Sequence, residues 1–480
     1  MEALLRWAAE LGVCDSPLGT STSSCLGRSL VIADFSDAGG RGLAAARDLR
    51  RGELVLRVPR AALFTSDRVM ADDPQVASCV VSHLPRLSSV QTLIICLLTE
   101  VGRGRNSNWY LYLSQLPTYY TILATFNDFE TEALQVDDAI WVAQKALRGI
   151  RSDWEEATPL MKRLGLKPKL LMFKSWLWAF ATVSSRTLHI AWDGAGCLCP
   201  IGDLFNYAAP DDDNSLADED TGDMMHQKTN KMLDETTFDH SSERLTDGGY
   251  EDVNGYCLYA RKSYRKGEQV LLAYGTYTNL ELLEHYGFLL GENPNEKIYI
   301  PLDLDLCTIG TWPRDSLYIL PNGHPSFALL CALRLWTTPT NHRKTFGHQI
   351  YSGSLLSIEN ELEIMKWLVK KCEETLQQLP TTIEFDEKLL IFLCKLRNST
   401  SCRIDVDQSI FQQEFAVFLR FHGFKLDCSI HSKLPVRLLR SLERWELAVQ
   451  WRCIYKRTLT KCTAYCKSLV RELSLQQNQQ

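Results

Sequence analysis

Hydrophobic and polar positions follow three different patterns along the chain. Between residues 29 and 65, short apolar runs separated by turn residues predict strands over 30–32, 42–46 and 54–58. From about residue 90 to 186, apolar residues recur at intervals of three and four, which predicts helices over 92–100, 133–150 and 170–182. Strand signals return between residues 199 and 274. The pattern indicates a helical insert within a β-rich scaffold.

The C-terminal part has a helical pattern after Pro301. One apolar stripe covers residues 358–379 and a second covers 441–473. Four basic residues lie off the second stripe, and we interpret them as a solvated face: Arg452, Lys456, Arg457 and Lys461. The predicted fold class is α+β. A β-rich domain over residues 1–290, with a helical insert at about 66–185, precedes an all-α domain over 311–480.

Residues 210–249 interrupt the strand pattern with an acidic, polar stretch that is nearly free of aromatic residues. Such a composition cannot bury enough apolar surface to order itself, so we predict a disordered loop. The first 13 residues predict an amphipathic helix that carries Glu2 and Glu10, unlike a transit or signal peptide. The longest apolar run is too short to span a membrane. We expect a cytosolic or nuclear protein.

Composition narrows the class of protein further. The net charge of −6 gives no reason to expect binding to nucleic acid. The 16 cysteines are scattered, without the paired spacing of a zinc site, so we expect free, mostly buried thiols and no metal.

Two segments of the chain resemble each other. Residues 46–53 and 260–268 each join a strand to a following apolar strand through a basic turn that ends in Gly-Glu. The glycines Gly52 and Gly267 are expected to supply the positive φ that the turn needs. We predict a hairpin at each copy.

Three short motifs carry candidate chemistry. Glycines at 39–42 lie between two predicted strands, where the backbone can approach a ligand closely. Asn206-Tyr207 closes an apolar run and suits recognition of an adenine or an amide. Tyr274 and Tyr286 bracket one turn, and both phenols could face the same small ligand. Each motif alone also fits an ordinary turn, strand end or packed core.

Taken in order, these motifs resemble those of the SET-domain methyltransferases. The matching residues are Gly40-Arg41-Gly42, Asn206-Tyr207, and Gly267-Glu268 through Tyr274-Gly275. The helical insert, the segment NWYLYLSQLP at 108–117 and the helical C-terminal half resemble the branch that contains the Rubisco large-subunit lysine methyltransferase and the actin-histidine methyltransferase. The resemblance implies a SET domain and S-adenosyl-L-methionine as cofactor.

The resemblance also implies roles for individual residues. The cofactor-binding set that it implies is Gly39, Gly40, Arg41, Glu100, Arg186, Asn206, Tyr207 and Tyr274. The substrate-binding set is Arg186, Asp203, Tyr274 and Tyr286. Tyr274 matches the catalytic phenol, and Tyr286 matches the second tyrosine of the acceptor channel. We expect no metal, because no Cys-x-Cys follows Tyr274.

Two positions depart from the family's pattern. Tyr207 stands where the family usually has histidine, and Ile190 stands where the Rubisco-directed relative has a second arginine. We expect a monomeric protein-lysine N-methyltransferase with a non-histone or unknown protein substrate. The alternatives are a protein-histidine methyltransferase and a catalytically inactive SET-fold binding module.

Overall fold

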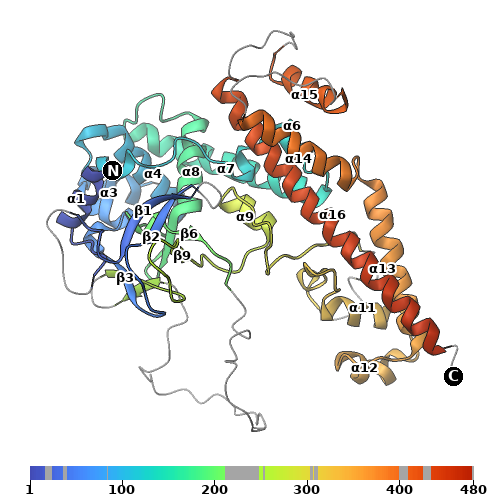
Figure 1. Cartoon of the computed structure of the whole chain (residues 1–480). Helices are drawn as coiled ribbons and strands as arrows, with labels where there is room; N and C mark the ends of the chain where they lie inside the picture. Colours follow the sequence, from blue (N-terminus) through green and yellow to red (C-terminus); the bar gives the residue numbers. More distant parts are fainter. Residues whose placement is uncertain are drawn as a thin grey trace, which may run out of the picture. The chain divides into compact units, whose positions relative to one another are not determined.

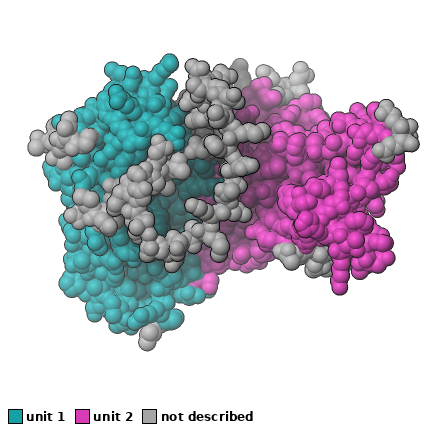
Figure 2. Space-filling view, turned by 90° about the horizontal axis from the view of Figure 1, so that it is seen from below, with its two compact units in different colours: residues 1–118, 153–276 teal, residues 119–152, 277–480 magenta. Residues whose placement is uncertain are grey.

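The computed structural model describes residues 1–16, 24–35, 40–83, 85–210, 248–251, 255–302, 306, 312–398, 409–424 and 434–477. The chain forms two compact units (Figure 2). Unit 1 contains residues 1–118 and 153–276, and unit 2 contains residues 119–152 and 277–480. Most of the predicted loop at 210–249 lies outside the described residues. Gly39 of the glycine motif also lies outside them.

Unit 1 carries the strands, which are short and form several small sheets (Figure 1). They are β1 (Leu30–Phe35), β2 (Gly40–Ala45), β3 (Leu54–Pro59), β4 (Thr187–Ile190), β5 (Asp193–Leu198), β6 (Asn206–Tyr207), β7 (Gly248–Glu251), β8 (Gly255–Tyr259) and β9 (Leu271–Leu272). The antiparallel pairs are β1–β2, β3–β8, β7–β8 and β4–β5, whereas β6 and β9 run parallel. The strands predicted over 30–32, 42–46 and 54–58 are confirmed.

The two similar segments pair with each other, so the prediction of two separate hairpins is wrong. β2 and β3 flank the first turn but enter different sheets. β3 pairs with β8 of the second copy, while the backbone N–H of Ala45 donates to Glu268 and that of Gly267 donates to Ala45. Gly52 and Gly267 have φ of +76° and +88°, as expected of the turn glycines. Each turn therefore connects strands of two different sheets, and the strands on either side of it pair with the other copy.

Helices pack around these strands in unit 1. They are α1 (Glu2–Glu10), α2 (Ser66–Asp72), α3 (Pro74–Val81), α4 (Ser89–Arg103), α5 (Tyr110–Leu113) and α8 (Phe173–Arg186). A capping box between Ser88 and Gln91 begins α4, and its apolar run over 93–98 is buried on every side. The long α7 (Asp137–Arg163) belongs to unit 2 up to residue 152 and to unit 1 beyond it.

Unit 2 is built from helices. They are α6 (Asp128–Glu132), α9 (Asn279–His285), α11 (Phe327–Thr337), α12 (Arg343–Tyr351), α13 (Ile358–Gln378), α14 (Ile383–Asn398), α15 (Ser409–Phe421) and α16 (Val436–Gln477). Along α13, Glu359 accepts from Gln477 and Glu373 pairs with Lys467; along α14, Asp386 pairs with Lys456 and Arg397 pairs with Glu446. The 42-residue helix α16 therefore runs antiparallel to α13 and α14 and packs against each of them in turn (Figure 1).

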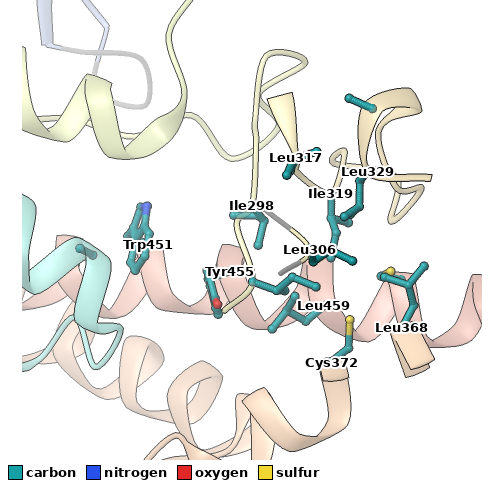
Figure 3. Packing of buried hydrophobic residues seen from close by; sticks show 14 of the residues in the cluster. Ile298, Leu306, Leu317, Ile319, Leu329, Leu368, Cys372, Trp451, Tyr455 and Leu459 are labelled. Carbon is teal, nitrogen blue, oxygen red and sulfur yellow. The ribbon is translucent and has the colours of Figure 1, made fainter. Parts of the chain in front are cut away.

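Buried apolar side chains from α13, α16 and the segments around Ile298 and Ile319 form one core of unit 2 (Figure 3). Tyr455 and Leu459 of α16 point into it, together with Leu368 and Cys372 of α13. A second cluster joins α14, α15 and the first half of α16. Because α16 faces two helices, most of its middle turns are buried.

This burial corrects the interpretation as a solvated face for two of the four basic residues on α16, whereas Arg457 and Lys461 are exposed as predicted. Arg452 and Lys456 are 3% and 1% exposed, and both pair with Asp386 of α14. The Lys456 ammonium also donates to Thr381 and to the Gln135 side chain. Burial lowers the pKa of Lys456, and the hydrogen bond that Lys456 donates to Asp386 opposes that shift. In the part of the chain that the structure describes, no helix is long and apolar enough to cross a membrane.

Candidate active site

Tyr274 lies two residues after β9, where β9 runs parallel to β6. Its hydroxyl donates to the backbone carbonyl of Phe205, the residue just before β6. Its ring is 5.2 Å from the ring of Tyr207, whose hydroxyl donates to the carbonyl of Gly275 at 2.8 Å. The strand pair thus brings the Asn-Tyr motif and the Tyr-Gly motif together through two reciprocal hydrogen bonds.

A partly buried ion pair contributes to the electrostatic surroundings of the Tyr274 phenol. Arg186 is the last residue of α8, and its Nη1 donates to the Asp203 carboxylate and to the Asp203 carbonyl, at 3.0 Å each. The Asp203 side chain is 2% exposed and also accepts from the Tyr112 hydroxyl at 2.8 Å. The paired charges are hydrogen-bonded, as burial requires.

The backbone before Asp203 is strained. Ile201 is fully buried and has a φ of +71°, which is unusual for a β-branched residue. The turn that it makes leads into the short 3₁₀ turn that carries Asp203, whose N–H donates to the Cys199 carbonyl. Such outliers cost about 1–3 kcal/mol and cluster at functional sites. The strain marks this turn as part of a candidate site.

The Tyr274 phenol is neutral at physiological pH. Burial raises its pKa above the ordinary value of 10, Arg186 opposes this shift, and Asp203 adds to it. Its proton is donated to a backbone carbonyl, which leaves the lone pairs of the phenol oxygen as acceptors. Tyr274 can therefore orient a neighbouring N–H or C–H group, but it cannot serve as a general base.

The glycine motif lies directly against the Asn206 amide. A Cβ atom on Gly42 would lie 2.7 Å from Asn206 Nδ2 and 3.0 Å from Gln269 Nε2. Gly40, at the start of β2, has a φ of +75°, and a Cβ atom there would meet nothing within 4 Å. The exposed backbone at Gly40 and the nearby amide of Asn206 fit a ligand that has a carboxylate and an amide-like ring edge.

The segment over residues 108–117 connects the glycine motif to the ion pair. The carbonyl of Gln115 accepts from Arg41 Nη2 at 3.1 Å, and the hydroxyl of Tyr112 reaches Asp203. Trp178 of α8 donates to the carbonyl of Pro117 at 2.8 Å and fixes the end of the segment. No role for Tyr112 was predicted from the sequence, although residues 108–117 contributed to the family resemblance.

Glu100 makes its contacts elsewhere. Its carboxylate accepts from Arg103 in the next turn of α4 and from the Ser107 hydroxyl. Arg103 in turn pairs with Asp73. The cofactor role predicted for Glu100 stays a prediction, as do the roles of the other site residues.

Tyr286 belongs to unit 2, where it ends α9. Its hydroxyl donates to the hydroxyl of Tyr277 at 3.3 Å, and the two ring centroids are 5.4 Å apart. Tyr277 was not predicted as a site residue from the sequence, because it lies between the two matched tyrosines and belongs to no motif. A shared channel for Tyr274 and Tyr286 stays a prediction.

Comparisons with known proteins show which family this chain resembles. Residues 280–421 match the family model described as Rubisco LSMT substrate-binding. Protein SET DOMAIN GROUP 40 of Arabidopsis thaliana is 48% identical over 482 residues, which cover 98% of this chain and 96% of that protein. The actin-histidine N-methyltransferase of Xenopus tropicalis is 24% identical over 73% of this chain. The matched part is 60% of that relative's length.

Solved structures show the same fold. A structure of the SET domain of LSMT bound to MeLysine and AdoHcy has a TM-score of 0.60 and 18% identity, covering 98% of this chain and 92% of that chain. A structure of Rubisco LSMT bound to AdoMet has a TM-score of 0.58 at the same identity and coverage. The predicted α+β fold class is confirmed. The chain belongs to the SET-domain protein methyltransferase family, in the branch that carries a Rubisco LSMT-type substrate-binding domain.

Proposed function

We propose that this chain is an S-adenosyl-L-methionine-dependent protein-lysine N-methyltransferase. The observation that supports this proposal most strongly is the placement of Tyr274. Its phenol is neutral, and its hydroxyl donates a hydrogen bond to the Phe205 carbonyl. Family membership supports methyl transfer to a protein, and the cofactor-bound state of the LSMT structures supports the choice of cofactor.

The residues present fit the cofactor. The open backbone at Gly40 and the neighbouring Arg41 would hold its amino-acid end, and Asn206 with Tyr207 would hold its adenine end. Arg186 and Asp203 keep each other's charge paired, so they add no net charge beside a cationic ligand. When bound, S-adenosyl-L-methionine supplies the electrophilic methyl group.

The chain's own task is alignment of the acceptor nitrogen. A lysine amine has an ordinary pKa of about 10.4 and must be neutral to react. Removal of the amine from water at this site disfavours the charged ammonium form. The Tyr274 oxygen accepts an N–H, which leaves the nitrogen lone pair free to attack along one line. Because Tyr274 stays protonated, the acceptor loses its proton to solvent.

Histidine is the second candidate acceptor, because the relatives that are 24–25% identical include actin-histidine N-methyltransferases. An imidazole needs no deprotonation near neutral pH. The two acceptors differ in the pH dependence of the rate. With lysine the rate rises up to high pH, whereas with histidine it levels off above about pH 7.

A catalytically inactive binding module is the alternative from a different class. The reason to consider this alternative is that Tyr207 stands where the family usually has histidine. Tyr207 nevertheless packs and hydrogen-bonds within the site, and Tyr274 is intact.

The test is label transfer from S-adenosyl-L-methionine with a tritiated methyl group into a whole-cell protein extract. The proposal expects at least one labelled band, with methyl-lysine after acid hydrolysis. Methyl-histidine in the hydrolysate would favour the second candidate. Binding of the cofactor without any labelled band would favour the inactive module.

A further inference from the structure

The two similar segments of unit 1 form one positively charged surface. Residues 46–53 and 260–268 lie antiparallel beside each other, and Leu49 and Tyr264 exchange backbone hydrogen bonds between them. Together the segments contain seven basic and three acidic residues, a net charge of +4 in a chain whose net charge is −6. Because the segments are far apart in the sequence, only the fold brings these positive charges together.

The three acidic side chains of the two segments are bonded to the turns themselves. Each accepts a hydrogen bond from a backbone N–H at 2.8 to 3.0 Å: Glu53 from Arg50, Glu268 from Arg265, and Asp48 from Lys266 of the other copy. Among the described residues, only Glu53 also pairs with a basic side chain, that of Arg47. The carboxylates therefore stabilise the turns and leave most of the basic side chains without an ion-pair partner.

Four exposed basic side chains in these segments form no ion pair with any residue that the structure describes. They are Arg50, Lys262, Arg265 and Lys266, and they are called the basic surface below. The Lys262 ammonium lies 5.4 Å from the centre of the Tyr264 ring, within the range of a cation–π interaction. Backbone hydrogen bonds between the two copies fix the main chain that carries all four charges.

The surroundings of these charges indicate which kind of anion they fit. A single-stranded nucleic acid stacks on exposed aromatic rings, but Tyr264, the one aromatic residue of the two segments, is 3% exposed. A membrane surface takes up apolar side chains, but Leu49 is 2% exposed. The net charge of the whole chain also repels a long polyanion. A short acidic segment of a protein needs only the complementary charges.

We propose that the basic surface is a docking site for an acidic segment of the methylation substrate. The inference rests on the proposed function, which requires a protein substrate, and it assigns that substrate to proteins with an exposed acidic segment. None of the four residues is among those matched to the cofactor or the acceptor. Docking should therefore lower the KM for the substrate and leave kcat unchanged.

The first test measures the binding of fluorescently labelled poly-L-glutamate by anisotropy. It compares the wild type with a quadruple variant of the basic surface, Arg50→Gln, Lys262→Gln, Arg265→Gln and Lys266→Gln. Each exposed ion pair contributes about 2-fold in affinity, so the Kd of the variant should be about 10-fold higher. Binding to the wild type should also weaken as salt is added.

The matched control removes the same charge from another part of unit 1. It replaces four other exposed lysines with glutamine: Lys162, Lys167, Lys169 and Lys174. This variant should keep the wild-type Kd, and both variants should melt at the wild-type temperature. Equal weakening in the two variants would show that binding follows only the total charge, which would overturn the inference. Tighter binding of duplex DNA or of anionic lipid vesicles than of poly-L-glutamate would also overturn it.

The second test is the labelling assay, with initial rates measured against the concentration of cell extract. The quadruple variant should show a KM about 10-fold higher for a labelled band, with kcat within about 2-fold of the wild type. Wild-type protein that labels no band would refute the proposed function, and anisotropy would still decide whether the basic surface binds an acidic segment. An active wild type whose quadruple variant keeps the same KM would refute the inference alone.

Discussion

Replacing Gly42 with alanine tests whether β2 and the Asn206 strand build one cofactor-binding surface. The new Cβ atom would lie 2.7 Å from Asn206 Nδ2, whereas ordinary van der Waals contact begins at 3.4 Å. The amide must therefore move by about 0.7 Å, and Gln269 must also yield. Gly40 is a poorer target, because its φ of +75° would strain any other residue whether or not a ligand binds.

The expected loss of cofactor affinity in Gly42→Ala follows from the displacement of one hydrogen-bonding group, the Asn206 amide. A displaced amide forfeits about 1–1.5 kcal/mol, so the Kd for S-adenosyl-L-methionine should rise about 10-fold. Overpacking in the same place should lower the free energy of unfolding by about 1–3 kcal/mol. Isothermal titration with cofactor and thermal melting measure the two effects on the same sample.

Gly194→Ala is the matched control. Gly194 also lies in a strand of unit 1, but a Cβ atom there would meet only Ser89 Oγ, at 3.9 Å. This variant should bind cofactor as the wild type does. If Gly42→Ala also keeps the wild-type Kd while its melting temperature falls, the contact with Asn206 serves packing and the placement of the cofactor is refuted.

Two further changes test the electrostatics of unit 2. Asp386→Asn leaves the buried Lys456 without its carboxylate and should lower the free energy of unfolding, measured by chemical denaturation, by about 3–5 kcal/mol. Glu387→Gln, at the exposed neighbouring position, should lower it by less than about 1 kcal/mol. Equal costs would contradict the buried ion cluster. Burial raises the pKa of Glu296 to about 7, so its contribution to stability is present below pH 4.5 and is lost as the pH rises through 7. Glu296→Gln should therefore raise the melting temperature more at pH 8 than at pH 5, and an equal change at both values would contradict that pKa.

Local periodicity was enough to predict most of the helices and strands. The apolar stripe over 358–379 is α13, and the runs at 30–32 and 54–58 are β1 and β3. Each of these signals depends on neighbours within a few residues. The corners built around Gly52 and Gly267 were mistaken for hairpins because a turn signal does not say which strand its arms will join.

The features that could not be predicted from the sequence depend on contacts between residues that are far apart in the chain. Arg452 and Lys456 look solvated on a helical wheel, and only the packing of α14 brings Asp386 to them. Tyr112 reaches Asp203 across 91 residues of sequence, so no local pattern could assign it to the site. Asn206, Tyr207 and Tyr274 could be predicted because the order of the motifs along the chain resembles that of a known family. The hydrogen bonds from Tyr274 to the Phe205 carbonyl and from Tyr207 to the Gly275 carbonyl could not be predicted.

The hydroxyl of Tyr274 tests the central claim most directly. Tyr274→Phe keeps the ring and its packing against Tyr207 and removes only the oxygen. Single-turnover methyl transfer should slow by about 10²-fold, which corresponds to about 3 kcal/mol of barrier, while the Kd for cofactor changes far less. Tyr256→Phe, which removes the hydroxyl of a buried tyrosine in unit 1, should keep the wild-type rate. A Tyr274→Phe variant that transfers methyl groups at the wild-type rate would contradict the account.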